Sequence, residues 1–98
     1  MNYAEFLEQD RRLVLLKGLE SATQFTSNSF VLGRYAAAVG HSVSADRLST
    51  DLTWLQEQGL VELEKNGAVL VAKLTMRGLD VATGRATVPG VQKPQPGI

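Results

Sequence analysis

The chain has 98 residues, of which 44% are hydrophobic and 20% are charged, and its ten basic and ten acidic side chains cancel to a net charge of zero. This length fits one domain with one modest core, and the absence of cysteine excludes disulfides, thiol catalysis and thiolate metal sites. The sequence contains neither a secretory signal nor an apolar run of the roughly 18 residues that a membrane span needs, so we expect a cytoplasmic protein without a membrane partner.

The first predicted element is a helix from Asn2 to Ser21. The segment lacks proline, is rich in Leu, Glu, Lys and Arg, and carries Leu15, Leu16 and Leu19 at helical spacing. The run Leu13-Val14-Leu15-Leu16 points in every direction around a helix, and a helix that is apolar all round is buried on more than one side. We therefore expect its second face to pack on another subunit or on the C-terminal tail, and a homodimer through this helix and the C-terminal region is a predicted assembly.

A second helix is predicted after a polar loop from Ser21 to Asn28, in which Phe25 is the only large apolar residue and is expected to act as an anchor. Ser27 is the predicted N-cap, and the helix is expected to end near Val39 because Gly40 is a typical C-terminal stop. The predicted buried stripe has the i, i+1, i+4, i+5, i+8 spacing of one helix face. It consists of Val31, Leu32, Tyr35, Ala36 and Val39.

The third predicted helix covers residues 44–58, with Ser44 as its N-cap and Gly59 as its stop. Its inward stripe consists of Leu48, Leu52 and Leu55. The side chains expected to face outward are Arg47, Thr50, Asp51 and Thr53. Trp54 is turned partly away from the leucines and is expected to cover the edge of their stripe.

After Gly59 the hydrophobic period changes from that of a helix to that of a strand. Residues 60–64 and 68–74 are β-rich and flank an Asn-Gly turn signal, so a β-hairpin is predicted. Thr75 is expected to cap a short helix from Met76 to about Thr83, which Gly84 ends. Residues 85–98 hold all three prolines of the chain and predict an extended tail with little capacity for a core.

This order of elements predicts a mainly α protein with a small β-hairpin, of the α+β class. Two helices that are joined by a short turn and followed at once by a hairpin form a winged helix-turn-helix. The prediction is therefore three helices, a two-stranded wing and a short C-terminal helix. Residues 1–84 form the predicted winged-helix domain, and residues 85–98 form the Pro- and Gly-containing tail.

Residues 43–61 resemble the recognition helix and first wing strand of ArsR- and MarR-type regulators. The recurrent ending in those proteins is a leucine, three residues and Gly-Leu-Val, and here Leu55 is followed by Gln-Glu-Gln and then Gly59-Leu60-Val61. The later Leu74-Thr75-Met76-Arg77-Gly78 resembles the Leu-Thr-x-x-Gly that closes the wing in the same proteins. With Gly84-Arg85 and Val88-Pro89-Gly90-Val91, the pattern from about Leu13 to Pro94 is also similar to small ArsR-like proteins of Mu-type transposable phages.

The resemblance implies a transcriptional regulator, encoded by a phage or prophage, that reads double-stranded DNA with the helix 44–58, as a dimer on two half-sites. Arg47 would then read guanine, and the hydroxyl groups would serve base edges or phosphates. The residues that the resemblance places at DNA are Ser44, Arg47, Ser49, Thr50 and Thr53 on the third helix, Arg34 on the second, Lys65 and Asn66 at the wing tip, and Lys73 and Arg77 near the end of the wing.

The charge of the chain favours a second hypothesis, a winged-helix protein–protein interaction or assembly adaptor module that does not bind DNA. DNA-binding domains usually carry a basic excess, since much of their affinity comes from neutralising phosphates. Here the third helix carries Asp46, Asp51 and Glu57, and the first wing strand carries Glu62 and Glu64. A shared face free of carboxylates would favour the DNA hypothesis, and acids interleaved with the basic candidates would favour the adaptor. The basic candidates are Arg34, Arg47, Lys65, Lys73 and Arg77.

No enzyme and no cofactor are predicted. The sequence has no nucleophile, base and orienting group at motif spacing and no Gly-rich phosphate loop. ArsR-type metal sensors present cysteines on the third helix, and this chain has none. His41 is the only histidine, and without acids or histidines at helical spacing around it, it is interpreted as a surface residue of the turn rather than as a metal ligand.

Overall fold

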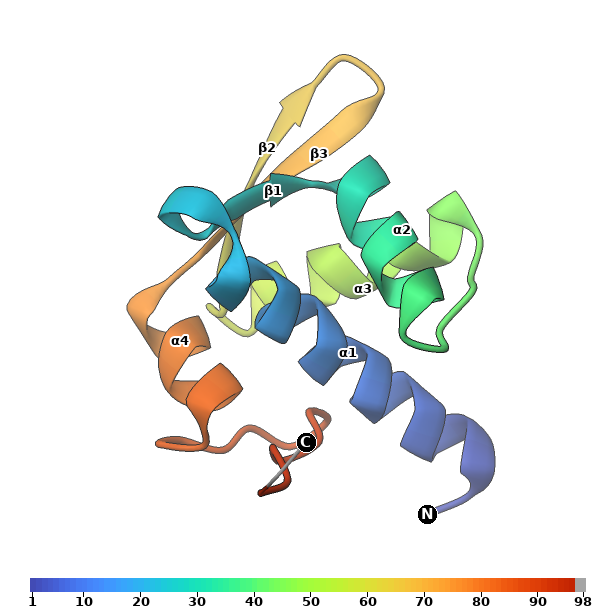
Figure 1. The fold of residues 1–98 in the computed structure, drawn as a ribbon, viewed down its shortest axis with the longest axis vertical. Helices are drawn as coiled ribbons and strands as arrows, with labels where there is room; N and C mark the ends of the chain where they lie inside the picture. Colours follow the sequence, from blue (N-terminus) through green and yellow to red (C-terminus); the bar gives the residue numbers. More distant parts are fainter. Residues whose placement is uncertain (97–98) are drawn as a thin grey trace.

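A computed structural model of the chain describes residues 1–96, which form four α-helices, a short 3-10 turn and a three-stranded antiparallel sheet (Figure 1). The predicted α+β winged-helix class is confirmed. The elements in chain order are α1 (Tyr3–Ser21), η1 (Thr23–Phe25), β1 (Thr26–Asn28), α2 (Ser29–Ala38), α3 (Ala45–Glu57), β2 (Val61–Asn66), β3 (Val69–Leu74) and α4 (Met76–Thr83). None of the helices in this part of the chain is long and apolar enough to cross a membrane.

The helices begin where side chains cap their first turns. Ser44 Oγ accepts a hydrogen bond from Arg47 N at 3.1 Å, and Thr75 Oγ1 accepts one from Gly78 N at 3.0 Å, so both predicted caps are confirmed. The prediction that Ser27 caps α2 is wrong, because Asn28 Oδ1 accepts from Val31 N at 2.9 Å instead. The helix therefore starts later than predicted, and Ser27 is left to a strand.

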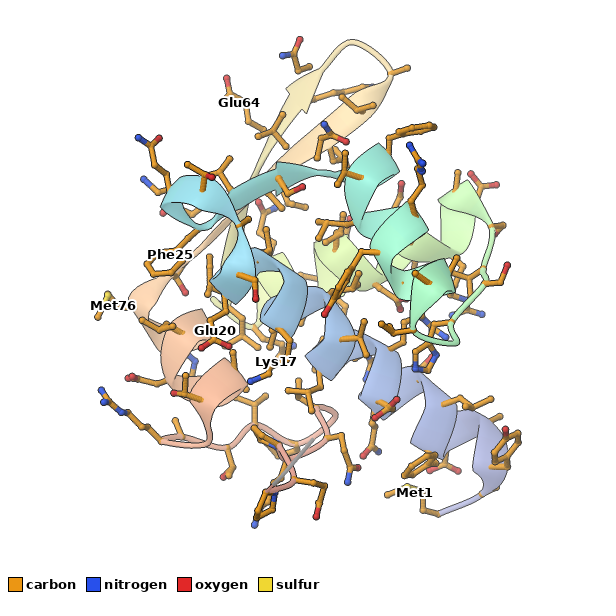
Figure 2. All side chains as sticks on the ribbon, in the orientation of Figure 1. Met1, Lys17, Glu20, Phe25, Glu64 and Met76 are labelled. Carbon is orange, nitrogen blue, oxygen red and sulfur yellow. The ribbon has the colours of Figure 1, made fainter. Side chains whose placement is uncertain are left out.

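The segment predicted as a polar loop contains the strand β1, which pairs with β3 and gives the sheet the order β1-β3-β2. The predicted hairpin is confirmed as the antiparallel pair β2–β3, and β1 adds a third strand that was not predicted. Just before β1, Gln24 and Phe25 adopt left-handed backbone angles (φ 56° and 57°). This turn directs the Phe25 side chain to the surface, where it is 39% exposed (Figure 2), so the prediction that Phe25 is an anchor is wrong.

The core surrounds α1, which crosses the molecule diagonally in Figure 1 and contacts α2, α3, α4 and β3. Leu15, Leu16 and Leu19 are fully buried. Val88 and Val91 from the tail join the same core, and Gln92 N donates a hydrogen bond to Gln9 O at 3.2 Å. The expectation that the tail adds little to a core is therefore wrong. The chain itself covers the apolar surface of α1 that otherwise suggested a second subunit.

Helix α2 is buried along a narrower line than predicted. Leu32 and Ala36 are buried, whereas Val31, Tyr35 and Val39 are between 40% and 49% exposed. Exposed residues of this set come one position before buried ones in the sequence, for example Val31 before Leu32, so the exposed row is rotated by about 100° around the helix axis. Because α2 packs on its neighbours through a single ridge, this second row of the predicted stripe remains at the surface.

Side-chain hydrogen bonds fix the wing against the helices. Ser29 Oγ at the start of α2 accepts from Leu70 N of β3 at 3.0 Å, and Gln56 Oε1 of α3 accepts from Leu63 N of β2 at 2.8 Å. Thr75 Oγ1 donates to Gly59 O at 2.7 Å, which ties the start of α4 to the end of α3. Gly78 permits this approach, since a Cβ there would lie 2.0 Å from Leu60 O.

Candidate nucleic-acid interface

The outer face of α3 is the group of side chains Arg47, Ser49, Thr50 and Thr53. Arg47, Thr50 and Thr53 are exposed and Ser49 is half-buried, and the three hydroxyl-bearing residues line a shallow hollow together with Trp54 and Glu57. The Thr50 hydroxyl donates to Asp46 O at 3.0 Å, so towards a partner it offers mainly an acceptor. The face is thus polar, rich in hydroxyls and carries one cation.

Asp51 does not belong to this face, and the prediction that it points outward is wrong. The residue is 1% exposed and forms an ion pair with Arg11 of α1, in which Nε and Nη2 of the guanidinium reach the two carboxylate oxygens. Since a buried charge requires a partner, the pair explains how an acid fits under a helix that packs with leucines. The acids that remain exposed on α3 are Asp46 and Glu57.

A second arginine of α1 covers the side of α3. The Arg12 guanidinium lies 3.9 Å from the centroid of the Trp54 ring, a cation–π arrangement. Its Nη1 donates to Gly90 O of the tail at 2.9 Å, and its Nη2 lies 3.2 Å from Glu8 Oε1. The other carboxylate oxygen of Glu8 lies 3.5 Å from Arg47 Nη1. One turn of α1 is therefore in ionic contact with the only cation of the outer face of α3.

The strand register separates the charges of the wing onto two faces. Glu62 lies opposite Lys73, and Glu64 lies opposite Val71, so these side chains share the far face of the sheet, where Figure 2 shows Glu64 standing away from the hairpin. Lys65 alternates to the inner face with Leu63. The sheet thus turns its two glutamates away from Lys65 and places Lys73 opposite an acid in the strand register.

The remaining basic candidates lie apart from one another. Arg77 is at the start of α4, where its Nε donates to Gln58 O at 3.2 Å. That position is at the base of the hairpin, and the six residues of β2 separate it from the tip by roughly 20 Å. Arg34 lies on α2 with its guanidinium 5.9 Å from the Phe30 ring. The structure therefore brings Ser44, Arg47, Ser49, Thr50 and Thr53 together but does not gather all the basic candidates on one carboxylate-free face.

His41 is buried, so the prediction of a surface histidine in the turn is wrong. It is 7% exposed, and its Nε2 lies 2.7 Å from Asp10 Oδ2 of α1. The partner acid comes from 31 positions earlier in the chain, which sequence spacing around His41 could not indicate. Within residues 1–96 no group of three or more His, Cys, Asp or Glu side chains is arranged to hold a metal ion.

Solved structures share this arrangement of helices and strands. RosR of H. salinarum matches with a TM-score of 0.63 at 23% identity, over 74% of this chain and 64% of that protein. Sco3205, a MarR family transcriptional regulator from Streptomyces coelicolor solved in complex with DNA, matches with a TM-score of 0.61 at 27% identity, over 89% of this chain and 60% of that protein. The chain spans less than two thirds of the length of these structures. The fold and the exposed helix face define a protein of the winged-helix class.

Two relatives match along almost their whole length. Protein gp26 of Escherichia phage Mu is 42% identical over 92 residues, which are 94% of this chain and 95% of gp26. An uncharacterized protein of Haemophilus influenzae is 35% identical over 97 residues, which are 98% of this chain and 93% of that protein. No family model matches the chain. The chain belongs to the family of the Mu protein gp26.

Proposed function

We propose that this chain is a DNA-binding winged-helix transcriptional regulator that reads duplex DNA with α3. The observation that carries the proposal is that α3 turns Asp51 into the core while Arg47, Thr50 and Thr53 stay exposed. The fold likeness to a MarR family regulator in complex with DNA supports it. Because Asp51 is buried in an ion pair with Arg11, the face of α3 presents one carboxylate fewer to a groove than the sequence suggested.

The proposed contacts divide by chemistry. Arg47 donates to a guanine edge or a phosphate, and the hydroxyls of Ser49, Thr50 and Thr53 meet base edges or phosphates. Ser44, whose Oγ lone pair caps the helix, is proposed to donate its hydroxyl proton to a phosphate. Lys65 and Asn66 at the wing tip and Arg34 on α2 are proposed backbone contacts. Lys73 and Arg77 are proposed to add only to the general attraction for phosphate, since one faces Glu62 and the other lies at the wing base.

We also propose a phage or prophage origin, supported by the likeness to gp26, and a homodimer that presents two α3 helices to half-sites about one helical turn apart. The leucines of α1 are covered within the chain. A dimer would therefore use the aromatic residues that stay exposed, such as Tyr3 and Phe6. A monomeric mass in light scattering at tens of micromolar contradicts the dimer.

A protein–protein adaptor is the second candidate, and a specific observation favours it. Arg47 is in contact with Glu8, Lys73 lies opposite Glu62, and Arg77 lies at the base of the wing. Under the adaptor hypothesis, the polar outer face of α3 binds a protein. The zero net charge does not lower the affinity for such a partner, because no phosphates have to be neutralised.

The two hypotheses predict opposite results in one binding experiment. The wild-type chain is titrated into a fluorescent pool of random 30-base-pair duplexes at about 50 and 200 mM salt, and anisotropy reports binding. A regulator binds at low salt and loses affinity steeply as salt rises, because released counterions drive association. Arg47→Glu should abolish this binding, whereas Arg85→Glu, the same charge change at an exposed position in the tail, should leave most of it. Absence of binding by the wild type at low salt favours the adaptor.

A further inference from the structure

Arg47 is the only basic residue of α3, so the state of its guanidinium determines the charge that the helix presents to a ligand. The side chain is 50% exposed, which leaves it accessible, yet its Nη1 lies 3.5 Å from Glu8 Oε2. An acid from another helix thus faces the one cation that the proposed interface depends on.

Two arginines contact the carboxylate of Glu8, one with each oxygen. Its Oε1 lies 3.2 Å from Arg12 Nη2, one helical turn further along α1. Arg12 is itself immobilised, because it stacks on Trp54 and donates to Gly90 O. Gly90 packs so closely on Trp54 that a Cβ there would lie 2.8 Å from the indole. The Glu8 carboxylate is therefore held beside α3 by an arginine that α3 and the tail keep in place.

We propose that Glu8 is an intramolecular competitor for Arg47: its carboxylate holds the guanidinium donors that a phosphate or a guanine edge of DNA takes when the complex forms. This inference rests on the proposed function. Carboxylate and phosphate oxygens accept from a guanidinium in the same way, so the exchange is possible without any change of fold. Glu8 then lowers the affinity for every duplex. The loss is smallest for sites whose phosphates or guanine edges accept from Arg47 more strongly than the Glu8 carboxylate does.

The strength of an exposed ion pair sets the size of the effect. Pairs of this kind change an equilibrium by up to about five-fold. Glu8→Gln removes the charge and keeps the size and shape of the side chain, so we expect it to raise the DNA affinity of the chain by about two- to five-fold.

The control for charge alone is Glu5→Gln, which makes the same change one turn earlier on α1. Glu5 is exposed, and within residues 1–96 it forms no ion pair. Both variants are measured in the wild-type background and in the Arg47→Met background, with the same duplex pool at low salt. The inference predicts that Glu8→Gln binds more tightly than Glu5→Gln, and that this difference disappears when Arg47 is absent.

The outcomes separate the inference from the proposed function. If the wild type binds through Arg47 but Glu8→Gln equals Glu5→Gln, or if its gain persists with Arg47→Met, the inference is wrong and the proposed function stands. If neither the wild type nor Glu8→Gln binds DNA at low salt, both are wrong. Thermal melting of each variant verifies that the folded state is retained.

Discussion

At the scale of the single residue, the ion pair between Arg11 and Asp51 is the interaction on which the placement of α3 depends most directly. Both side chains are almost completely buried, and they join α1 to the middle of α3. Removing one member of a buried pair leaves the other charge without compensation, which costs more than the pair itself contributes. The pair therefore specifies how the two helices meet rather than adding a large net stability.

Asp51→Ala should lower the free energy of unfolding by about 3–5 kcal/mol, measured by urea denaturation, because it strands the charge of Arg11. Asp46→Ala, at an exposed position on the same helix, should change it by less than about 1 kcal/mol. The double variant Arg11→Met with Asp51→Leu should recover most of the loss, since apolar residues of similar size fill the site. A double variant that is no more stable than Asp51→Ala contradicts this account.

Individual buried polar residues were the part that the sequence could not predict. Helical periodicity assigns polar residues to the surface, and by that rule Asp51 was expected to be exposed. His41 was expected at the surface because it lies in a turn and has no acid or histidine at helical spacing around it. Their partners, Arg11 and Asp10, come from 40 and 31 positions away in the chain. Only the packing of α1 against the other helices brings these charges together, and a single sequence contains no local signal for it.

At the scale of the element, a shift of the N-cap of α2 from Ser27 to Asn28 turns the end of the predicted loop into a strand. Asn28 caps the helix, so Thr26 to Asn28 remain free to pair with β3 as the strand β1. Asn28 has both roles, as the last residue of the strand and the cap of the helix. The turn between β1 and α2 is therefore as short as the chain permits.

Asn28→Ala should lower the stability of the fold by about 1 kcal/mol, the usual cost of a lost N-cap, in thermal or urea unfolding. Ser27→Ala is the matched change one position earlier, and it should cost clearly less because Ser27 does not cap the helix. Equal losses in the two variants would mean that the cap assignment is wrong.

The longer elements were predictable because each combines a cap, a hydrophobic period and a stop. Helix α3, for example, has Ser44, three inward leucines and Gly59, and all of these signals agree. Strand β1 has only Thr, Ser and Asn, which show no alternation of apolar and polar residues. Its stability comes from backbone pairing with β3, which lies more than forty residues further along the chain. The outer face of α3 could be predicted for the same reason as the helix, whereas the contact with Glu8 could not.

At the scale of the whole molecule, the tail completes the core. Val88 and Val91 are buried, and Gly90 between them accepts from Arg12. The predicted boundary of the domain at residue 84 therefore depends on how much the tail contributes to the free energy of unfolding.

The double variant Val88→Ala with Val91→Ala should lower the free energy of unfolding by about 2–4 kcal/mol, because it removes two buried side chains from the core. Val39→Ala with Val43→Ala removes the same groups from exposed positions and should have a much smaller effect in the same urea titration. If the two double variants are equally stable, residues 85–98 are dispensable for folding and the domain ends at Gly84.

The position of Trp54 makes its fluorescence sensitive to the packing around α3. It is the only tryptophan of the chain, and on α3 it packs against both the Arg12 guanidinium and Gly90. Its fluorescence therefore arises at the point where α1, the tail and the proposed recognition helix meet. Departure of the tail would expose the indole to water and shift its emission to longer wavelength, and movement of Arg12 would remove a nearby cation. Ligand binding at α3 can thus be followed on the unlabelled protein, without a dye that would itself disturb so small a surface.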